Sequence, residues 1–203
     1  MNVKLVKLSY QFKEHLFEMM DEWYTYTNSD SPFAIFKNDY HDFDKYLNEL
    51  EIKFDTDDKV SDSVFFLLYK DENKFIGASN IRHKLNEYLL NYGGHIGDGI
   101  RPTYRNKGYG NKLVYLSLQE AKKLNINKVL MTCNKNNIAS RKTIVKNGGI
   151  FENEIVEPSS NKIIQRFWIN FLLGILLWDI FIRICFKIIL IWLGIFYYPH
   201  HGN

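Results

Sequence analysis

One short segment of the chain concentrates the residue types that bind phosphate groups. It consists of Arg105, Asn106, Lys107, Gly108, Tyr109 and Gly110. The segment separates a predicted strand at residues 95–101 from a predicted helix at residues 110–124. At such a helix start, unpaired backbone N–H groups and the helix dipole favour an anion. The glycines let a phosphate approach the backbone and the two cations add positive charge, so we predict a pyrophosphate-binding loop.

Two better-known phosphate loops do not fit this segment. A P-loop needs the pattern G-x-x-x-x-G-K-[ST], which does not occur in the chain. A dinucleotide fingerprint needs a third glycine where this chain has Leu113, and it follows the first strand of its fold. Here the loop follows the fourth predicted strand. A glycine-rich helix start can also be only a tight turn, so the interpretation depends on the surrounding elements.

Hydrophobic periodicity predicts those surrounding elements. We expect strands at residues 3–9, 63–69, 75–82, 95–101, 128–133, 150–156 and 162–169. We expect helices at residues 10–26, 40–54, 85–92, 110–124 and 138–146. Asn137 is the expected N-cap of the last helix and Gly148 its stop signal. This order predicts an α/β fold whose mixed, mostly antiparallel sheet has a central parallel pair flanked by helices.

Two motifs in this order resemble a known superfamily. Ile100-Arg101-Pro102 followed by Arg105-x-x-Gly108-x-Gly110 resembles motif A of the GNAT superfamily of N-acetyltransferases. The strand at residues 129–134, followed by Asn137-x-x-Ser140 in a helix, resembles motif B. Residues 81–83 and 94–97 also resemble a bacterial branch of the superfamily. The resemblance covers about residues 1–169 and implies the GNAT fold.

The resemblance implies acetyl-CoA as cosubstrate and assigns residues to it. Backbone amides of residues 106–111 would hold the CoA pyrophosphate, with Arg105 shaping the loop. The main chain of the strand that ends at Ile100 would pair with the pantetheine arm. Further contacts would come from Asn137 and Ser140, whose alternative role is helix capping. The implied cofactor-binding residues are Ile100, Arg105, Asn106, Lys107, Gly108, Tyr109, Gly110, Asn111, Asn137 and Ser140.

The catalytic residues do not carry over from the superfamily. Many of its members use a Glu and a Tyr at positions that here hold Thr132 and Ile144, and neither of these can transfer a proton. Asp98 is the main substitute, because it shares a strand face with apolar residues and burial should raise its pKa. His95 is a second candidate base. Alternatively, His95 is a hydrogen-bonded structural histidine. The alternative for Asp98 is that it is a variant position without a function.

Composition and charge narrow the class of protein. The chain has 203 residues, 46% hydrophobic and 24% charged, as expected of a globular protein. Two cysteines and no apparent secretory signal predict a cytoplasmic protein without a metal ion. Residues 1–100 carry 11 Lys/Arg and 18 Asp/Glu, whereas residues 101–166 carry 13 Lys/Arg and 4 Asp/Glu. The basic region, residues 101–166, suits an anionic cofactor and contains no nucleic-acid-binding motif. The acidic region, residues 1–100, either attracts a cationic acceptor or is solvated surface.

Residues 170–203 form an apolar tail after the predicted domain of residues 1–169. Asp179, Arg183 and Lys187 interrupt it at intervals of four residues, so its uncharged stretches are shorter than the roughly 20 residues of a spanning helix. Three interpretations remain open. The tail associates with a membrane through residues 170–198, it packs on the domain or a partner, or it is a non-native product of a reading-frame change.

Together these observations predict an N-acetyltransferase that moves an acetyl group from acetyl-CoA to an amine. The acceptor would be a small molecule or an amino-terminal group that attacks directly in a ternary complex. The alternative is a non-catalytic acyl-CoA-binding sensor domain, favoured by the missing Glu and Tyr. A homodimer is compatible with either.

Overall fold

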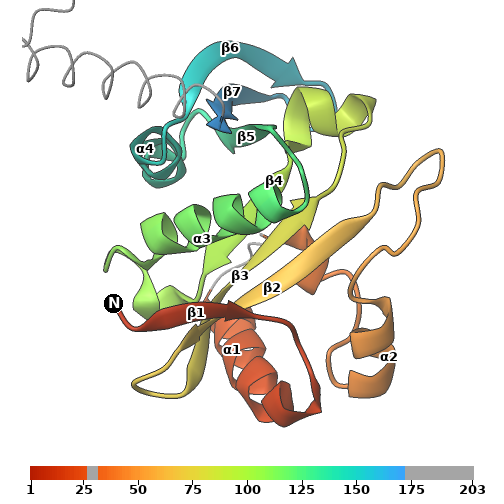
Figure 1. Cartoon of the computed structure of the whole chain (residues 1–203), viewed down its shortest axis with the longest axis vertical. Helices are drawn as coiled ribbons and strands as arrows, with labels where there is room; N and C mark the ends of the chain where they lie inside the picture. The colour runs from red at the N-terminus through yellow and green to blue at the C-terminus, as the bar shows by residue number, and fades with distance from the viewer. Residues whose placement is uncertain (27–31, 172–203) are drawn as a thin grey trace, which may run out of the picture. The chain divides into compact units, whose positions relative to one another are not determined.

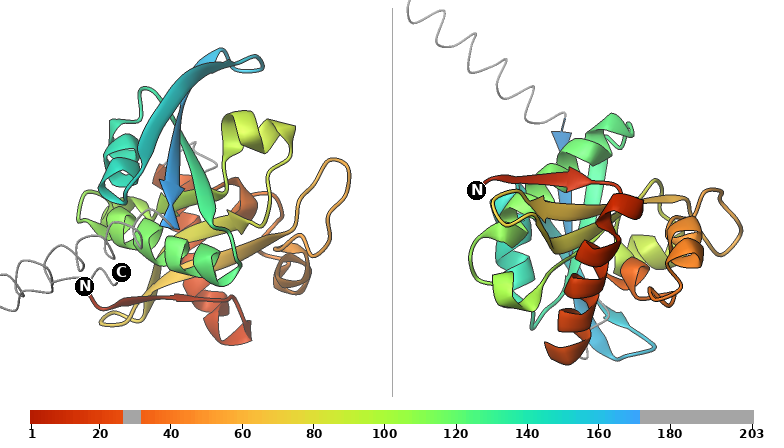
Figure 2. Two further views of the ribbon diagram at one scale, coloured as in Figure 1. Left: turned by 45° about the horizontal axis from the view of Figure 1, so that its top comes forward. Right: turned by 90° about the horizontal axis from the view of Figure 1, so that it is seen from below.

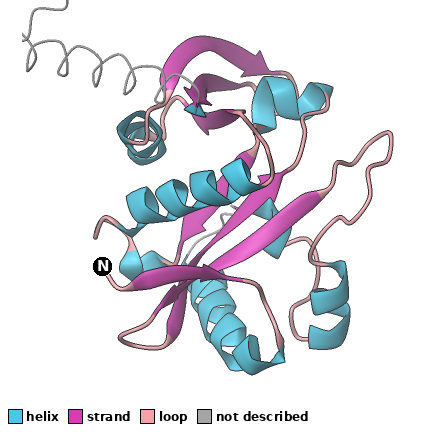
Figure 3. Ribbon diagram, viewed as in Figure 1, coloured by secondary structure: helices cyan, strands magenta, loops and turns pink. Residues whose placement is uncertain are grey.

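The computed structural model describes residues 1–26 and 32–171. Its first compact unit is Met1–Ile169, built from two β-sheets with helices packed against them (Figures 1 and 3). The cysteine of this part, Cys133, is buried and free. No group of residues that could hold a metal ion, and no helix that could cross a membrane, occurs in the described ranges. The predictions for Asp179, Arg183 and Lys187 in the tail lie outside those ranges.

The first sheet contains four antiparallel strands in the order β1-β2-β3-β4. They are β1 Val3–Val6, β2 Asp62–Tyr69, β3 Lys74–Arg82 and β4 Ile96–Ile100. Ser79 of β3 pairs with Asp98 of β4, and Ala78 pairs with Gly99. Because side chains alternate along a strand, Ser79 and Asp98 lie on one face of the sheet and Ala78 and Gly99 on the other.

Helix α1, Lys13–Tyr26, covers the Ala78 face of this sheet (Figures 1 and 2). Its buried residues Leu16, Met19, Met20 and Trp23 recur at helical spacing, which places them on one stripe. They form the larger core together with the short helix α2, Phe43–Glu49.

Helix α3, Tyr109–Lys123, covers the opposite face. The Ser117 hydroxyl lies 2.8 Å from the Ser79 hydroxyl, so α3 is on the side of the sheet that also carries Asp98. Leu67, Ile76, Ile100 and Leu113 form the apolar core between α3 and the sheet. Helices α1 and α3 therefore lie on opposite faces of the first sheet. We call the two faces at β4 the α1 side and the α3 side.

The second sheet contains three strands in the order β5-β7-β6. They are β5 Lys128–Asn134, β6 Ile150–Glu157 and β7 Lys162–Asn170. Strands β6 and β7 pair antiparallel. Helix α4, Ile138–Lys146, connects β5 to β6 and contacts α3.

The prediction of one sheet with a central parallel pair is not confirmed, because β4 and β5 belong to different sheets. The two strands meet where the His95 N–H donates to the Leu130 carbonyl at 2.8 Å. Gly94, at φ +67°, permits this approach, since a Cβ there would lie 2.7 Å from the Leu130 oxygen. Beyond that point both strands line a cavity instead of pairing.

Two predicted helices are shorter in the structure, and local hydrogen bonds explain why. The helix expected at residues 40–54 is limited to α2, because the Asp62 carboxylate accepts the Ile52 N–H at 2.7 Å and holds that segment against β2. The helix expected at residues 85–92 ends as a π-helical turn, Leu89–Gly93. There the Gly94 N–H donates to the Leu89 carbonyl at 2.7 Å, five residues earlier.

Candidate active site

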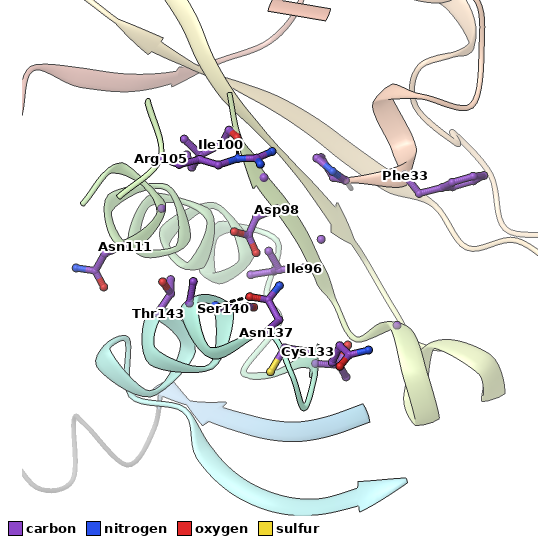
Figure 4. Close-up of a pocket in the computed structure, with 18 of the residues that line it drawn as sticks. Phe33, Ile96, Asp98, Ile100, Arg105, Asn111, Cys133, Asn137, Ser140 and Thr143 are labelled. Atoms are coloured by element: carbon purple, nitrogen blue, oxygen red, sulfur yellow. Dashed lines mark hydrogen bonds between the residues drawn. The ribbon is translucent and has the colours of Figure 1, made fainter. Parts of the chain in front are cut away.

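A cavity of about 770 Å³ lies where β4 and β5 diverge (Figure 4). Its walls come from β4, β5, the loop before α3, α4 and the end of α1. The residues predicted from the sequence that line it are Asp98, Ile100, Arg105, Asn106, Gly108, Gly110, Asn111, Asn137 and Ser140. The structure therefore brings residues of both sequence motifs and the main candidate base to one cavity.

The loop before α3 has the backbone geometry of an anion site. Gly108 is the N-cap of α3 at φ +85°, and no side chain within the described ranges caps this helix. Asn106, two residues earlier, is also left-handed at φ +59°. Left-handed residues beside a helix start turn successive N–H groups toward one point. With the helix dipole, these N–H groups favour a bound phosphate at the cavity end.

Arg105 anchors this loop to the end of β4. Its Nε donates to the Ile100 carbonyl at 2.9 Å, and its guanidinium lies 5.9 Å from the Trp23 ring centroid. The strand end is held further by Glu22 of α1, whose carboxylate accepts from Arg101 Nε at 2.5 Å and from the Thr103 N–H at 3.0 Å. Burial acts to raise the pKa of Glu22, but these hydrogen bonds together outweigh it and lower the pKa, so the Glu22 carboxylate is charged at neutral pH.

The side chains of Lys107 and Tyr109 do not line the cavity, although both residues belong to the predicted loop. The Lys107 ammonium lies 5.2 Å from the Tyr104 ring centroid. Tyr109 packs against Tyr69 and Tyr104 with centroid distances of 5.6 and 6.0 Å. The contribution of these two residues to the site is therefore limited to backbone and loop shape.

Helix α4 presents its N-terminus to the same cavity. The Asn137 side chain accepts from the Ser140 N–H at 3.0 Å, which confirms the predicted N-cap (Figure 4). At the other end of the helix, the Asn147 side chain donates to the Asn111 side chain at 3.0 Å. This bond links the end of α4 to the start of α3, two helices that both contribute residues to the cavity wall.

Asp98 lies in the cavity wall with Ile96 and Ile100 on the same face of β4 (Figure 4). Burial among these groups raises the pKa of Asp98 from its usual value near 3.8 to about 6. The carboxylate thus remains ionised at neutral pH, yet it binds a proton more readily than an ordinary aspartate. The predicted position and pKa direction of Asp98 agree with the structure.

His95 does not line the cavity. It is buried, its Nδ1 accepts the Leu130 N–H at 2.9 Å, and burial lowers its pKa to about 4. The imidazole is therefore neutral at physiological pH and fastens the start of β4 to β5. This geometry favours the structural role of His95, and we do not retain it as a base.

Sequence reasoning missed Cys133, which lies on β5 in the cavity wall (Figure 4). Burial raises the pKa of its thiol to about 11, so the thiol is protonated at neutral pH. Its neighbour Thr132 donates its hydroxyl to the Tyr92 carbonyl at 2.8 Å, and Ile144 is fully buried. As predicted, neither of these two positions supplies an acid or a base.

The α1 side of the cavity was also not predicted. It is walled by Trp23, Phe33 of the short helix η2, Phe33–Ile35, and Arg82 at the end of β3. Arg82 belongs to the Ile81-Arg82-His83 segment noted in the sequence, which was the available signal. The aromatic residues gave none, because their approach to β4 depends on how α1 packs on the sheet.

Comparison with known proteins identifies relatives of this arrangement of strands, helices and cavity. The model of the acetyltransferase (GNAT) family matches residues 13–148. A search of curated proteins found no match. Among solved structures, the GNAT-family acetyltransferase from Bacillus anthracis superposes with a TM-score of 0.57 at 18% identity, covering 84% of this chain and 95% of that one.

Two further structures of the same fold contain ligands. Spermidine N-acetyltransferase from Vibrio cholerae, in complex with CoA and spermine, has a TM-score of 0.56 at 14% identity over 83% of this chain and 95% of that one. The microcin C7 self-immunity acetyltransferase, in complex with acetyl-CoA and AMP, has a TM-score of 0.58 at 15% identity over 83% of this chain and 92% of that one.

The family match extends from α1 to the end of α4 and contains the loop before α3, β4 and β5. The chain therefore belongs to the GNAT family of acetyltransferases, enzymes that depend on an acyl-CoA.

Proposed function

We propose that this chain transfers an acetyl group from acetyl-CoA to an amine by direct attack in a ternary complex. The observation that carries the proposal is the common cavity of the anion-binding loop and Asp98. One end of that cavity suits a pyrophosphate. The same cavity is lined by the Asp98 carboxylate, whose pKa burial raises to about 6.

The residues fit acetyl-CoA in two respects. Backbone N–H groups at the start of α3, with Gly108 and Gly110 leaving space above them, suit the pyrophosphate. Strand β4 is the edge strand of its sheet, so its main chain beside Gly97–Ile100 is available to hydrogen-bond an extended pantetheine arm. Asn137 and Ser140 at the start of α4 border the same space.

The chemistry requires a neutral amine and a proton acceptor. The amine nitrogen attacks the thioester carbonyl carbon, a C–N bond forms, the C–S bond breaks, and CoA leaves as a thiolate. Asp98 accepts the proton that the attacking nitrogen loses, and the thiolate takes a proton from water. Holding the two reactants together supplies much of the rate acceleration, which is compatible with a site that has few acid–base groups.

A second function has one observation in its favour. Thr132 and Ile144 occupy the positions where many family members have an acid and a base, so a non-catalytic acyl-CoA sensor is the alternative. Calorimetry with acetyl-CoA, combined with thiol release across a panel of amines, distinguishes the two. We expect binding and amine-dependent thiol release. Tight binding without release for any amine would favour the sensor.

A further inference from the structure

The α1 side of the cavity is positively charged, which is unusual for a site that binds an amine. Arg82 and Arg105 are cationic lining residues, and the acidic lining residue of the described ranges is Asp98. Asp98 lies on the α3 side of β4, whereas Arg82 follows Ala78 by four residues on β3 and thus lies on the α1 side. An acceptor approaching from the α1 side therefore meets a guanidinium before it meets the carboxylate.

The guanidinium of Arg82 is held in a fixed orientation. Its Nη1 donates to the Gly93 carbonyl at 3.3 Å and to the Gly94 carbonyl at 3.2 Å. It lies against Gly97, where a Cβ atom would be 3.5 Å from both Nη1 and Nη2. Within residues 1–26 and 32–171, the hydrogen bonds of this side chain use Nη1. Nη2 and Nε thus keep their donor capacity beside the cavity.

The buried carboxylate of Asp62 stabilises the charge of Arg82 and leaves the N–H donors of the guanidinium available. Asp62 pairs with Arg82 across β2 and β3, and its charge opposes the lowering of the Arg82 pKa by burial. The Asp62 oxygens accept from the Ile52 N–H at 2.7 Å and from the Asn80 side chain at 2.8 Å. The guanidinium therefore retains donors for a ligand.

We propose that Arg82 binds a carboxylate of the acceptor, so that the acceptor is an amine that also carries a carboxylate, such as an α-amino acid. The inference rests on the proposed acetyl transfer. Gly97, beside which the guanidinium lies, directly precedes Asp98 on the edge strand β4, and the two charged side chains lie on opposite faces of the sheet. An acceptor whose carboxylate binds Arg82 therefore reaches Asp98 with its amine around the free edge of β4. A polyamine would instead place a second cation beside Arg82.

The test compares each amino acid with its own carboxamide as acceptor, using phenylalanine and leucine with wild-type protein. The carboxamide has the lower amine pKa, so amine chemistry alone favours it. We expect kcat/KM to favour the carboxylate by at least about tenfold, as for a charge-assisted hydrogen-bonded pair. Arg82→Gln should remove that preference, because kcat/KM should fall more for the amino acid than for its carboxamide. Arg82→Lys should keep part of the preference, because it retains charge without the planar fork.

Arg166→Gln is the matched control, because Arg166 is a buried arginine in an ion pair with Glu152 and does not line the cavity. It should leave the carboxylate preference unchanged. Acetylation of carboxamides or polyamines at least as fast as of amino acids would overturn the inference while supporting acetyl transfer. An equal loss on both acceptors in Arg82→Gln and Arg82→Lys would also overturn it, since that result assigns Arg82 a structural role. No acetylation of any amine would instead contradict the proposed function.

Discussion

Asp98 is an ordinary residue type in an unusual environment. On a solvated strand it would titrate near its usual value, but between Ile96 and Ile100 in the cavity wall its pKa rises to about 6. The proposed role of this residue depends on that shift. The same burial that makes it a better proton acceptor also makes its ionised form costly to the fold.

The pH profile of Asp98→Asn tests its role as base. For an acceptor amine with a pKa well above 7, log kcat/KM should rise with pH at a slope of about 1 as the amine loses its proton. Below about pH 6 the wild-type slope should steepen to about 2, because Asp98 is then protonated. The variant should lose at least about tenfold in rate at pH 7.5 and keep a slope of about 1 throughout. A wild-type rate in the variant would exclude the base role.

The stability of the same variant provides an independent check. The folded pKa of Asp98 is above its unfolded value near 3.8, so the wild-type chain loses stability as pH rises from about 4 to 6 and does not recover it above. Asp98→Asn should therefore melt about 3 to 6 °C higher at pH 7.5, and this gain should shrink at pH 4. Thermal unfolding at both values measures it. A pH-independent difference would contradict the burial of an ionised Asp98.

Some site residues could be predicted from sequence and others could not, for a physical reason. Asn137 was predicted as a cap because capping is decided within four residues of chain, and Asp98 followed from strand alternation. Arg82 and Cys133 reach the cavity only through the pairing of β3 with β4 and the divergence of β5. Trp23 depends on how α1 packs. These are tertiary relations that no local pattern encodes.

At the scale of elements, the start of α3 is the feature on which the proposed cofactor binding depends. Its N-cap is a left-handed glycine with no side-chain cap in the described ranges, so the backbone itself forms the binding surface. Any other residue at Gly108 would be strained at φ +85° and would place a Cβ atom 2.8 Å from the Met1 side chain, so the loop would have to shift.

Gly108→Ala should therefore weaken acetyl-CoA binding by at least about tenfold and lower the free energy of unfolding by about 1 to 2 kcal/mol. Gly148→Ala is the control. Gly148 has φ +90°, a Cβ added there would have no atom within 4 Å, and the residue does not line the cavity. It should lose similar stability with unchanged affinity. Equal affinities of the two variants for acetyl-CoA, measured by calorimetry, would argue against the α3 start as the pyrophosphate site.

The types and order of most elements were predictable, whereas the sheet arrangement was not. Strand alternation and helical spacing fix which face of each element is apolar, so β2, β3, α3 and α4 match the sequence patterns closely. Whether β4 and β5 pair depends on Gly94 and His95, which join the strands at one end. Because β4 and β5 both line the cavity, the departure from the expected sheet accounts for the candidate site.

At the scale of the whole molecule, the cavity-lining residues that the structure describes belong to the unit Met1–Ile169. The chain carries opposite charge in two sequence regions, with the excess of Lys and Arg in residues 101–166 that contain the proposed cofactor loop. A polyanionic cofactor is attracted to such a region, and added salt screens the attraction.

A chain truncated to residues 1–171 should keep the acetyl-CoA affinity and kcat of the full chain within about twofold, because it contains every cavity-lining residue that the structure describes. Calorimetry and thiol release on both lengths measure this. If the full chain sediments with lipid vesicles and the truncated chain does not, the tail is responsible for membrane association. A truncated chain that melts cooperatively but no longer binds acetyl-CoA would show that residues 172–203 complete the site.

Acetyl transfer by direct attack is tested most directly by a quenched single turnover with isotope-labelled acetyl-CoA and an amine acceptor. The products and the intact protein are then analysed by mass spectrometry. We predict label on the amine alone, with none on the protein at any time, because the Cys133 thiol is protonated at neutral pH and a poor nucleophile. Label that passes through Cys133, or bound acetyl-CoA that never labels an amine, would contradict the account.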